Sequence, residues 1–418
     1  MLRKIIFGIV ISIIVIGGIY WFIYTKEART PISDGINAIP SDAAIIFESK
    51  HAKSTWKKLS QTNIMWEELL GTQAISEINQ QGKLIDSILE INPEISELLD
   101  NHSIFISVHN TSTDNLDLLY VYSLPNLTYK NSVENFLKEK IHYMKIPITT
   151  SEFENETISK IPTSKTSSIF VSMPNGILII SGNQLLLEAS IHQLKSGQSF
   201  ANDKNFSKVI NTAGKNVDAN IYINYKKFPT LFNDFIFPTA KKEINSLVNF
   251  ADYSGWDITI KPNALQLSGF TLASDSTNSF LNLFSKQKPQ EVELTKIIPS
   301  KTATMLFFGI SNIKSFQLDY KNYLASKKIA AGTESSSIAY NNYIKGIHEK
   351  YNLDIETTML GWMDNEMALI ITEPTSSDFR DNSYAVIRSN NIENAIQTLN
   401  TISSTVINGI CCVFSIYS

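Results

Sequence analysis

The sequence predicts an α+β protein: an N-terminal transmembrane helix followed by mostly antiparallel sheets with packed helices, partly duplicated. Three observations lead to this fold class. Residues 5–24 form a run of 20 uncharged positions. After this run, strand-like segments are joined by short turns, with amphipathic helices between the hairpins, which favours antiparallel pairing. A parallel doubly wound sheet would need regular crossover connections, which the sequence lacks. Finally, three short motifs recur in the same order, 259 or 264 residues apart.

Residues 1–29 are predicted to be a cytoplasmic stub and a single transmembrane anchor, with the helix over residues 5–24. Twenty helical residues span about 30 Å at ~1.5 Å each, which matches the hydrocarbon core of a bilayer. Thirteen of these positions are Ile, Val or Phe. Tyr20, Trp21 and Tyr24 crowd the far end, where aromatic rings prefer the headgroup layer. The lipid bilayer is therefore the partner expected for residues 5–24.

A cleaved signal peptide is the alternative interpretation of this segment. Its apolar region would be shorter, ~7–15 residues, and would end in small residues at a cleavage site. Here the run ends in bulky aromatic residues, which favours an uncleaved anchor. Arg3, Lys4 and the free amine outweigh the cations after the helix, which Glu27 partly offsets, so the N-terminus is expected inside. We therefore expect a single-pass inner-membrane protein with a periplasmic C-terminal region, joined to the anchor by a tether at residues 30–37.

Residues 38–290 are predicted to form one extracytoplasmic α+β domain. Its strands are apolar runs bounded by turn residues, and its helices carry apolar residues at three- and four-residue spacing. In chain order we expect a strand at 43–49, a helix over 75–89, strands at 103–109 and 116–123, helices over 132–141 and 185–194, and a strand at 219–225.

Two hairpins complete this domain. The first joins residues 168–173 to residues 177–180 through the turn 174–176, where Asn-Gly supplies the positive φ angles that a tight turn needs. The second joins the strand that contains Trp256 to residues 264–273 through a Pro-Asn turn. Both hairpins predict antiparallel neighbours.

Residues 291–405 are predicted to be an incomplete second copy of the first half of this domain. Ile-Pro-Ser at 39–41 recurs at 298–300, Asp-Asn at 100–101 recurs at 364–365, and a helix start at 133–135 recurs at 392–394. The offsets are 259, 264 and 259, and a loop can absorb a difference of this size. Residues 406–418 are an atypical apolar tail, which suggests a truncated or out-of-frame end.

Composition excludes two classes of protein. Charged residues make up 18%, the net charge is −4, and no long basic stretch is present, so no nucleic-acid partner is expected. Cys411 and Cys412 are the only two cysteines, so the chain is not a disulfide scaffold. For this pair, free thiols are the preferred interpretation, and a disulfide between the two adjacent cysteines is the alternative.

We predict no catalytic, cofactor-binding or metal-binding residues and no cofactor. His102 and His109 are seven residues apart around one strand, so their side chains should face opposite sides, and surface histidines are the default. His348-Glu349 lacks the second histidine of a zinc-binding helix, and Gly82-Lys83 lacks the rest of a phosphate-binding loop. The dispersed carboxylates leave an acid/base pair open.

Four tryptophans are candidates for the lining of a sugar- or peptide-binding groove. They are Trp56, Trp66, Trp256 and Trp362. Packing in the core, or half-buried packing, is the preferred interpretation, because large aromatic rings are usually buried.

The chain resembles the bacterial membrane-anchored domain of unknown function 3352 family. The features that carry the resemblance are, in order, the N-terminal anchor, the Ile-Pro-Ser-Asp segment at 39–46, the strand at 220–225, and Gly255-Trp256-Asp257 leading to residues 265–270. The resemblance covers most of residues 37–403. It implies a single-pass envelope protein and supplies no catalytic residues.

The preferred interpretation is a non-enzymatic envelope protein that binds or scaffolds an unknown envelope protein or polymer outside the cytoplasm. An envelope hydrolase that uses dispersed carboxylates is the alternative, and a secreted form follows if the anchor is cleaved. A deep pocket with two carboxylates and a perturbed pKa would favour the hydrolase. A broad exposed apolar surface would favour the binding protein.

Overall fold

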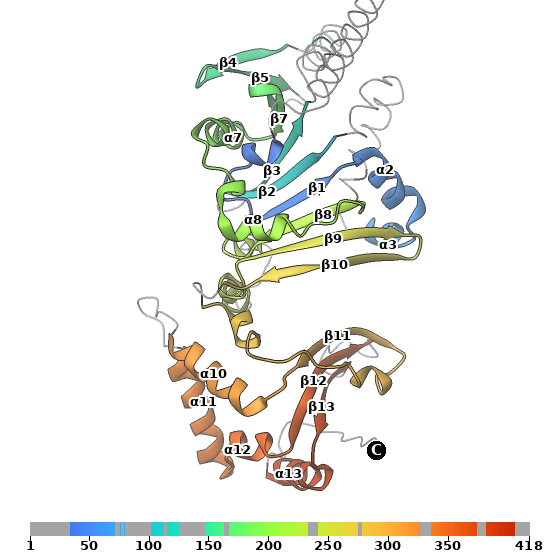
Figure 1. Ribbon diagram of the computed structural model, residues 1–418, viewed down its shortest axis with the longest axis vertical. Coiled ribbons are helices and arrows are strands. Elements are labelled where there is room, and N and C mark those ends of the chain that lie inside the picture. Colours follow the sequence, from blue (N-terminus) through green and yellow to red (C-terminus); the bar gives the residue numbers. More distant parts are fainter. Residues whose placement is uncertain are drawn as a thin grey trace, which may run out of the picture. The chain divides into compact units, whose positions relative to one another are not determined.

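The computed structural model of the protein divides the chain into two compact units, Met1–Thr277 (unit 1) and Asn278–Ser418 (unit 2). The described residues are 34–71, 76, 79, 102–112, 115–124, 135, 147–162, 167–232, 241–274, 278–326, 336–373 and 382–405. Both units combine helices with antiparallel sheets (Figure 1), so the predicted α+β class is confirmed.

Unit 1 is built on a ten-stranded sheet with the order β10-β9-β8-β1-β2-β3-β7-β6-β5-β4, and neighbouring strands are antiparallel. The first strand, β1, lies inside the sheet between β8 and β2. The strands are β1 (Ile45–Ser49), β2 (Ile104–Ser112), β3 (Asn115–Ser123), β4 (Thr149–Phe153), β5 (Glu156–Pro162), β6 (Ser168–Ser172), β7 (Ile177–Ser181), β8 (Ala219–Asn224), β9 (Tyr253–Lys261) and β10 (Ala264–Leu272).

Both predicted hairpins are confirmed. β6 and β7 pair around residues 174–176, where Asn175 has φ 50° and Gly176 has φ 76°. β9 and β10 pair along their full length. The strands predicted at 103–109 and 116–123 pair as β2 and β3. Short polar turns therefore fix the antiparallel neighbours.

One face of the ten-stranded sheet carries the main hydrophobic core. Its residues pack beneath α7 (Gln184–Ser196), α8 (Lys204–Ile210) and the 3-10 helix η1 (Gly35–Ala38). α7 begins where Asn183 accepts a backbone N–H of the first turn at 2.9 Å, and it ends at Gly197, which has φ 68°. Each fully buried aliphatic side chain of this core stabilises the fold by about 1.5–3 kcal/mol. The largest of them are Ile39, Leu119, Ile158, Ile177, Ile179, Leu187 and Ile191.

The predicted tether at residues 30–37 is wrong for the part that the structure describes. The side chain of Asp34 caps η1 by accepting the N–H of Ile36 at 3.4 Å. Ile36 is 3% exposed and belongs to the main core. Because Ile36 is buried in this core, the chain is packed into the fold of unit 1 from Asp34 onward.

Several predicted elements lie outside the described residues. They are the anchor over residues 5–24, most of the helices over 75–89 and 132–141, and the tail at 406–418 with Cys411 and Cys412. Among the residues that the structure describes, no helix combines the length and the apolar character that crossing a membrane requires.

Unit 2 contains a three-stranded antiparallel sheet with the order β11-β12-β13. One face of this sheet packs against Leu294 and Ile298, and Ala368 and Ile370 on it are 5% and 1% exposed. The last helix begins at Ile392, as predicted. The elements are β11 (Thr302–Gly309), α10 (Ile313–Ser326), α11 (Ser336–Tyr351), α12 (Ile355–Leu360), β12 (Met363–Thr372), β13 (Ser383–Ser389) and α13 (Ile392–Thr405).

The boundary between the units lies earlier than the predicted 290/291, at 277/278. Residues 278–290 belong to unit 2 because the ring of Phe284 packs 5.0 Å from that of Phe316. In addition, the Gln290 side chain accepts a hydrogen bond from Asn365 at 2.7 Å. These contacts tie the connecting segment to the second sheet.

The order, direction and register of three strands recur in the two units. Ile45 pairs with Val108 in unit 1, and Thr304 pairs with Ile371 in unit 2. The offset from 45 to 304 is 259, the same as between the two Ile-Pro-Ser motifs, and the offset from 108 to 371 is 263. The turns before the strands also match: in each, an N–H donates to the carbonyl of the proline three residues earlier, at 3.1 Å (Pro40 and Pro299).

The third strand follows the same rule. Phe105 pairs with Val121 across β2 and β3, and Ala368 pairs with Val386 across β12 and β13. The offset from 105 to 368 is again 263, and that from 121 to 386 is 265. These offsets are constant over residues 304–308 of β11, 367–371 of β12 and 383–387 of β13, so each residue in these stretches has a counterpart in unit 1.

Candidate functional site

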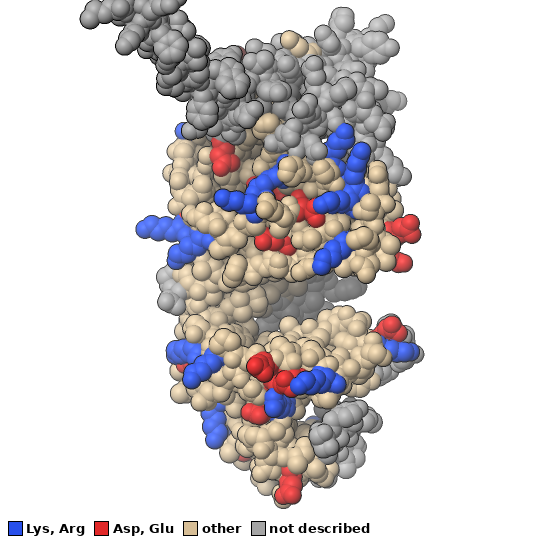
Figure 2. Space-filling view, turned by 45° about the vertical axis from the view of Figure 1, so that its right-hand side comes forward, with Lys and Arg blue, Asp and Glu red and all other residues tan. Residues whose placement is uncertain are grey.

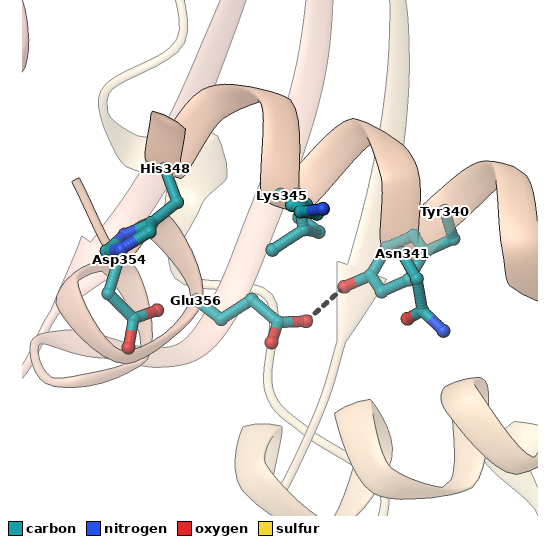
Figure 3. Close-up of a pocket in the computed structure, with 7 residues that line it drawn as sticks. Tyr340, Asn341, Lys345, His348, Asp354 and Glu356 are labelled. Atoms are coloured by element: carbon teal, nitrogen blue, oxygen red, sulfur yellow. Dashed lines mark hydrogen bonds between the residues drawn. The ribbon is translucent and has the colours of Figure 1, made fainter. Parts of the chain in front are cut away.

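A pocket of about 360 Å³ opens on the surface of unit 2, between α11 and the start of α12. Its lining is polar apart from one isoleucine and consists of Tyr340, Asn341, Ile344, Lys345, His348, Asp354 and Glu356. Figure 3 shows His348 and Asp354 at one end of this site and Tyr340 and Asn341 at the other, with Glu356 between them. The pocket therefore presents donors and acceptors together.

The turn between the two helices places the carboxylates. Asn352 has φ 50° directly after α11 ends at Tyr351. Asp354 then caps α12, since its side chain accepts the N–H of Thr357 at 3.2 Å and the Thr357 hydroxyl at 2.7 Å. These hydrogen bonds hold the pKa of Asp354 below its ordinary value, helped by the nearby His348. The lowered pKa of Asp354 is therefore explained by its role as the cap of α12.

Glu356 is held by two partners inside the unit. Lys321 donates to one carboxylate oxygen at 2.6 Å. The Tyr340 hydroxyl donates to the other at 2.5 Å, and Figure 3 shows this second bond. Burial alone would raise the pKa of Glu356, but these hydrogen bonds outweigh it and the pKa lies below its ordinary value. Burial and the bond to Glu356 together raise the pKa of Tyr340 to about 12.

The carboxyl groups of the pocket do not have the pKa direction that a general acid needs. A general acid at neutral pH needs a raised carboxyl pKa, whereas both carboxyls here, Asp354 and Glu356, have lowered ones. Their oxygens also serve partners within the unit. The lining also contains a cationic side chain, Lys345, which is exposed and whose Nζ lies 3.4 Å from the carboxylate of Glu349. This lining can hydrogen-bond a small polar ligand.

A second constellation lies inside unit 1. Ser107 and His109 are two apart on β2 and therefore on one face, and the Ser107 hydroxyl is 2.8 Å from Nε2 of His109. Nδ1 of the same ring is 3.0 Å from Oδ1 of Asp42, in the turn before β1. Burial raises the pKa of Asp42, but the hydrogen bond and charge of His109 outweigh it, so that the pKa is lowered.

The order carboxylate, imidazole, hydroxyl is that of a serine-hydrolase relay, but the surroundings differ. Ser107 and His109 are both 0% exposed, so a substrate carbonyl cannot reach the hydroxyl in this conformation. The arrangement instead satisfies three polar groups and ties the turn at Asp42 to the second strand. Its role in this structure is positional.

Unit 1 also buries a carboxylate on β1. Glu48 is 8% exposed, and its oxygens accept from the Tyr222 hydroxyl at 2.9 Å and the Ser103 hydroxyl at 3.4 Å. Burial raises the pKa of Glu48 above its ordinary value, and the lowering by Tyr222 is smaller. Burial and the charge of Glu48 in turn raise the pKa of Tyr222.

His102 and His109 have different surroundings in the structure. The ring of His102 packs against that of Tyr122. Tyr122 lies on the face of the β2–β3 pair opposite to the face that carries His109, as the spacing predicted. The expectation of a surface position is wrong for His109, which is 0% exposed. The sequence feature that indicates its burial is the Ser-x-His pair, two polar residues that alternate with apolar ones in a central strand.

The tryptophans pack as preferred rather than line a groove. Trp66 and Trp362 are 4% and 3% exposed. Trp56 and Trp66 meet edge to face, with ring centroids 5.3 Å apart. Within the described ranges no three or more His, Cys, Asp or Glu residues are placed to hold a metal ion.

The sheet of unit 2 exposes apolar side chains on the face opposite its core. Leu306 and Leu369 are directly paired across β11 and β12 and are 51% and 44% exposed. Ala385, which pairs with Leu369 on β13, is exposed as well. We call this row the open face. Figure 2 shows acidic and basic side chains interspersed among wide uncharged areas on one side of the molecule.

Among the comparisons with known proteins, a match comes from a model of a protein family. No curated protein and no solved structure matches it. A family described as "Protein of unknown function (DUF3352)" matches residues 5–408, nearly the whole chain. The protein therefore belongs to the DUF3352 family of proteins of unknown function.

Proposed function

We propose that this protein is a membrane-tethered binding or scaffolding module of the bacterial envelope, whose two units lie outside the cytoplasm. The single observation that carries the binding role is the open face of unit 2. Soluble proteins expose contiguous apolar surface mainly where a partner covers it. Here Leu306, Leu369 and Ala385 form such a surface on a regular, uncharged part of a sheet.

The proposed membrane anchor rests on the sequence of residues 5–24, whose length and aromatic end suit a bilayer. Fractionation of cells that express the tagged full-length chain tests it. We expect the protein in the membrane fraction after alkaline washing, and we expect protease added outside the inner membrane to cleave it. A mature chain found in the soluble pool, beginning after Tyr24, would contradict the proposed membrane anchor.

The binding role is tested by chemical cross-linking in intact cells followed by purification. We expect Leu369→Ser, on the open face, to remove cross-linked partners that the natural chain retains. The matched control is Leu267→Ser on β10 of unit 1, because Leu267 is 50% exposed on a different sheet. Equal partner recovery from both variants would count against the open face as the binding surface.

The hydrolase alternative has less support. Its best location is the pocket of unit 2, where Asp354 and Glu356 both have lowered pKa values and partners within the fold. Hydrolysis of an envelope polymer by the purified chain that is lost in Glu356→Gln but retained in Glu349→Gln would favour it. Glu349 is the control because it is an exposed carboxylate on α11, the other helix that lines the pocket, whereas Glu356 lies on α12.

We further infer that β11-β12-β13 is a second copy of β1-β2-β3. The support is the shared strand order, the shared proline turn, and the offsets of 259, 263 and 265 in the paired residues. An experimental structure tests this by superposition of the two sets of strands. A better fit after a shift of two residues in any strand would contradict the duplication.

A further inference from the structure

We propose that the outer edge of β13 is a dimerisation site, at which two copies of this chain pair β13 with β13 in antiparallel fashion around Val386. The inference goes beyond the binding role above and does not require it. Among the described residues β13 is the last strand of its sheet, with β12 as its neighbour on one side. Its other edge therefore presents backbone N–H and C=O groups without a described strand opposite.

The comparison with unit 1 shows what such an edge accepts. The counterpart of β13 is β3, and residues 119–123 of β3 pair with β7. An offset of 265 carries these five residues to residues 384–388. The same stretch that holds an antiparallel neighbour in unit 1 is thus the stretch that is open in unit 2.

The sequence of β13 is complementary to itself. An antiparallel pair centred on Val386 places Tyr384 opposite Arg388 of the second copy, and Arg388 opposite its Tyr384. Tyr384 is 47% exposed, and the Arg388 side chain is 45% exposed while its Nη1 donates to Glu366 of its own copy at 2.6 Å. A cation over an aromatic ring is a favourable cross-strand pair. Each dimer would contain two of these pairs, related by the twofold axis.

Pairing would also extend the open face. In the same register Ala385 lies opposite Ile387 of the second copy, on the side of the sheet that carries Leu306 and Leu369. The apolar row would then continue across six strands. No proline interrupts β13, and Arg388 is its one charged residue, so the usual features that block edge pairing are few.

β13 is a better site than the opposite edge. β11 has the chain segment before it close to its end: the backbone N–H of Lys288 donates to the Ser311 hydroxyl at 3.0 Å, and Gln290 lies against Gly309. A second copy would have to displace this segment. The edge at residues 384–388 has no such contact among the residues described.

Disulfide trapping on the full-length chain in detergent tests the proposal. Cys411 and Cys412 are first changed to serine, and Val386→Cys is added. Directly opposite residues in an antiparallel pair have Cα atoms about 4.5–5.5 Å apart, within the range that a disulfide spans. We expect rapid formation of a covalent dimer on mild oxidation. The matched control is Tyr343→Cys on α11, since Tyr343 is 67% exposed but lies away from the edge.

A charge pair provides the second readout at a position that tolerates change. Tyr384→Glu places an anion opposite Arg388 of the second copy, and Tyr384→Lys places a cation there. We expect the Glu variant to dimerise roughly tenfold more tightly than the Lys variant in sedimentation equilibrium, because two pairs change sign. A merely exposed surface would give equal values.

Three outcomes would overturn the proposal. One is a Val386→Cys chain that cross-links no faster than the Tyr343→Cys control. Another is a monomer at all concentrations with no difference between the two Tyr384 variants. The third concerns a separate chain that carries Val386→Cys and keeps both natural cysteines: an internal disulfide to Cys411 or Cys412 in its monomer would show that the chain's own tail covers this edge.

Discussion

The same three-stranded arrangement occurs twice in this protein, in two different surroundings. In unit 1, β1 and β3 each have a further strand beside them, and Phe47, Ile106 and Tyr120 form a half-buried row. In unit 2 the corresponding row is Leu306, Leu369 and Ala385, and it is exposed. The strands are apolar on both faces in both units. The same apolar row is therefore half-buried in the wider sheet of unit 1 and exposed in the three-stranded sheet of unit 2.

The buried polar groups differ between the units in a related way. Ser107 and His109 of unit 1 correspond, at the offset of 263, to Ile370 and Thr372 of unit 2, so the hydrogen-bonded relay belongs to unit 1 alone. A buried carboxylate on a strand inside the sheet occurs in each unit, Glu48 on β1 and Glu366 on β12. Glu48 has a raised pKa and Glu366 a lowered one, because their partners differ.

The largest expected effect distinguishes the two faces of β12. Ile370 is 1% exposed and Leu369 is 44% exposed on the adjacent position. Ile370→Ala should destabilise unit 2 by about 2–5 kcal/mol, because it leaves a cavity in the core. Leu369→Ala should change stability by less than about 1 kcal/mol. Hydrogen exchange of β12 peptides measures both, and similar losses would show that the open face is buried in solution.

The second effect compares the buried carboxylates. Glu366 is 0% exposed and accepts the N–H groups of Glu293 and Leu294 at 2.8 and 2.9 Å and Nη1 of Arg388 at 2.6 Å. Glu366→Gln should destabilise unit 2 by roughly 1–3 kcal/mol, because hydrogen bonds to a charged acceptor are lost. Glu48→Gln removes a charge that burial disfavours, so its effect should be smaller. Denaturant unfolding of both variants, monitored by hydrogen exchange in each unit, decides the order.

The third effect tests whether the relay in unit 1 is structural. His109→Gln should destabilise unit 1 by about 1–2 kcal/mol, because Ser107 or Asp42 loses a hydrogen-bonding partner. His102→Gln should cost less, since that ring lies at the end of the strand against Tyr122. Thermal unfolding provides the comparison. An undiminished stability in His109→Gln would show that the relay contributes nothing to the fold.

Turn chemistry and alternation were sufficient to predict the two hairpins β6–β7 and β9–β10. Asn175-Gly176 adopts the positive φ angles that its sequence implies, and β9 and β10 pair through the expected turn. The buried His109 was missed because its partner Asp42 is 67 residues away, and only the fold brings the two together. The pocket was missed for a similar reason. Lys321 reaches Glu356 across 35 residues, between two helices whose packing no local pattern specifies.

The smallest expected effect is a difference in the sign of a pH dependence. The pKa of Glu366 is lowered in the folded protein, since hydrogen bonds from Leu294 and Arg388 outweigh burial, so its stabilisation is present above the unfolded pKa of about 4.3 and is lost as pH falls through the folded value. The pKa of Glu48 is raised, so the folded state binds its proton more tightly and stability declines as pH rises from the unfolded to the folded value. The stability lost in Glu366→Gln should therefore be greatest at pH 7 and shrink on acidification. Glu48→Gln should instead gain stability relative to the natural chain as pH rises. Unfolding free energies of the three chains between pH 4 and pH 8 measure both slopes, and slopes of the same sign would mean that the two carboxylates have equivalent surroundings.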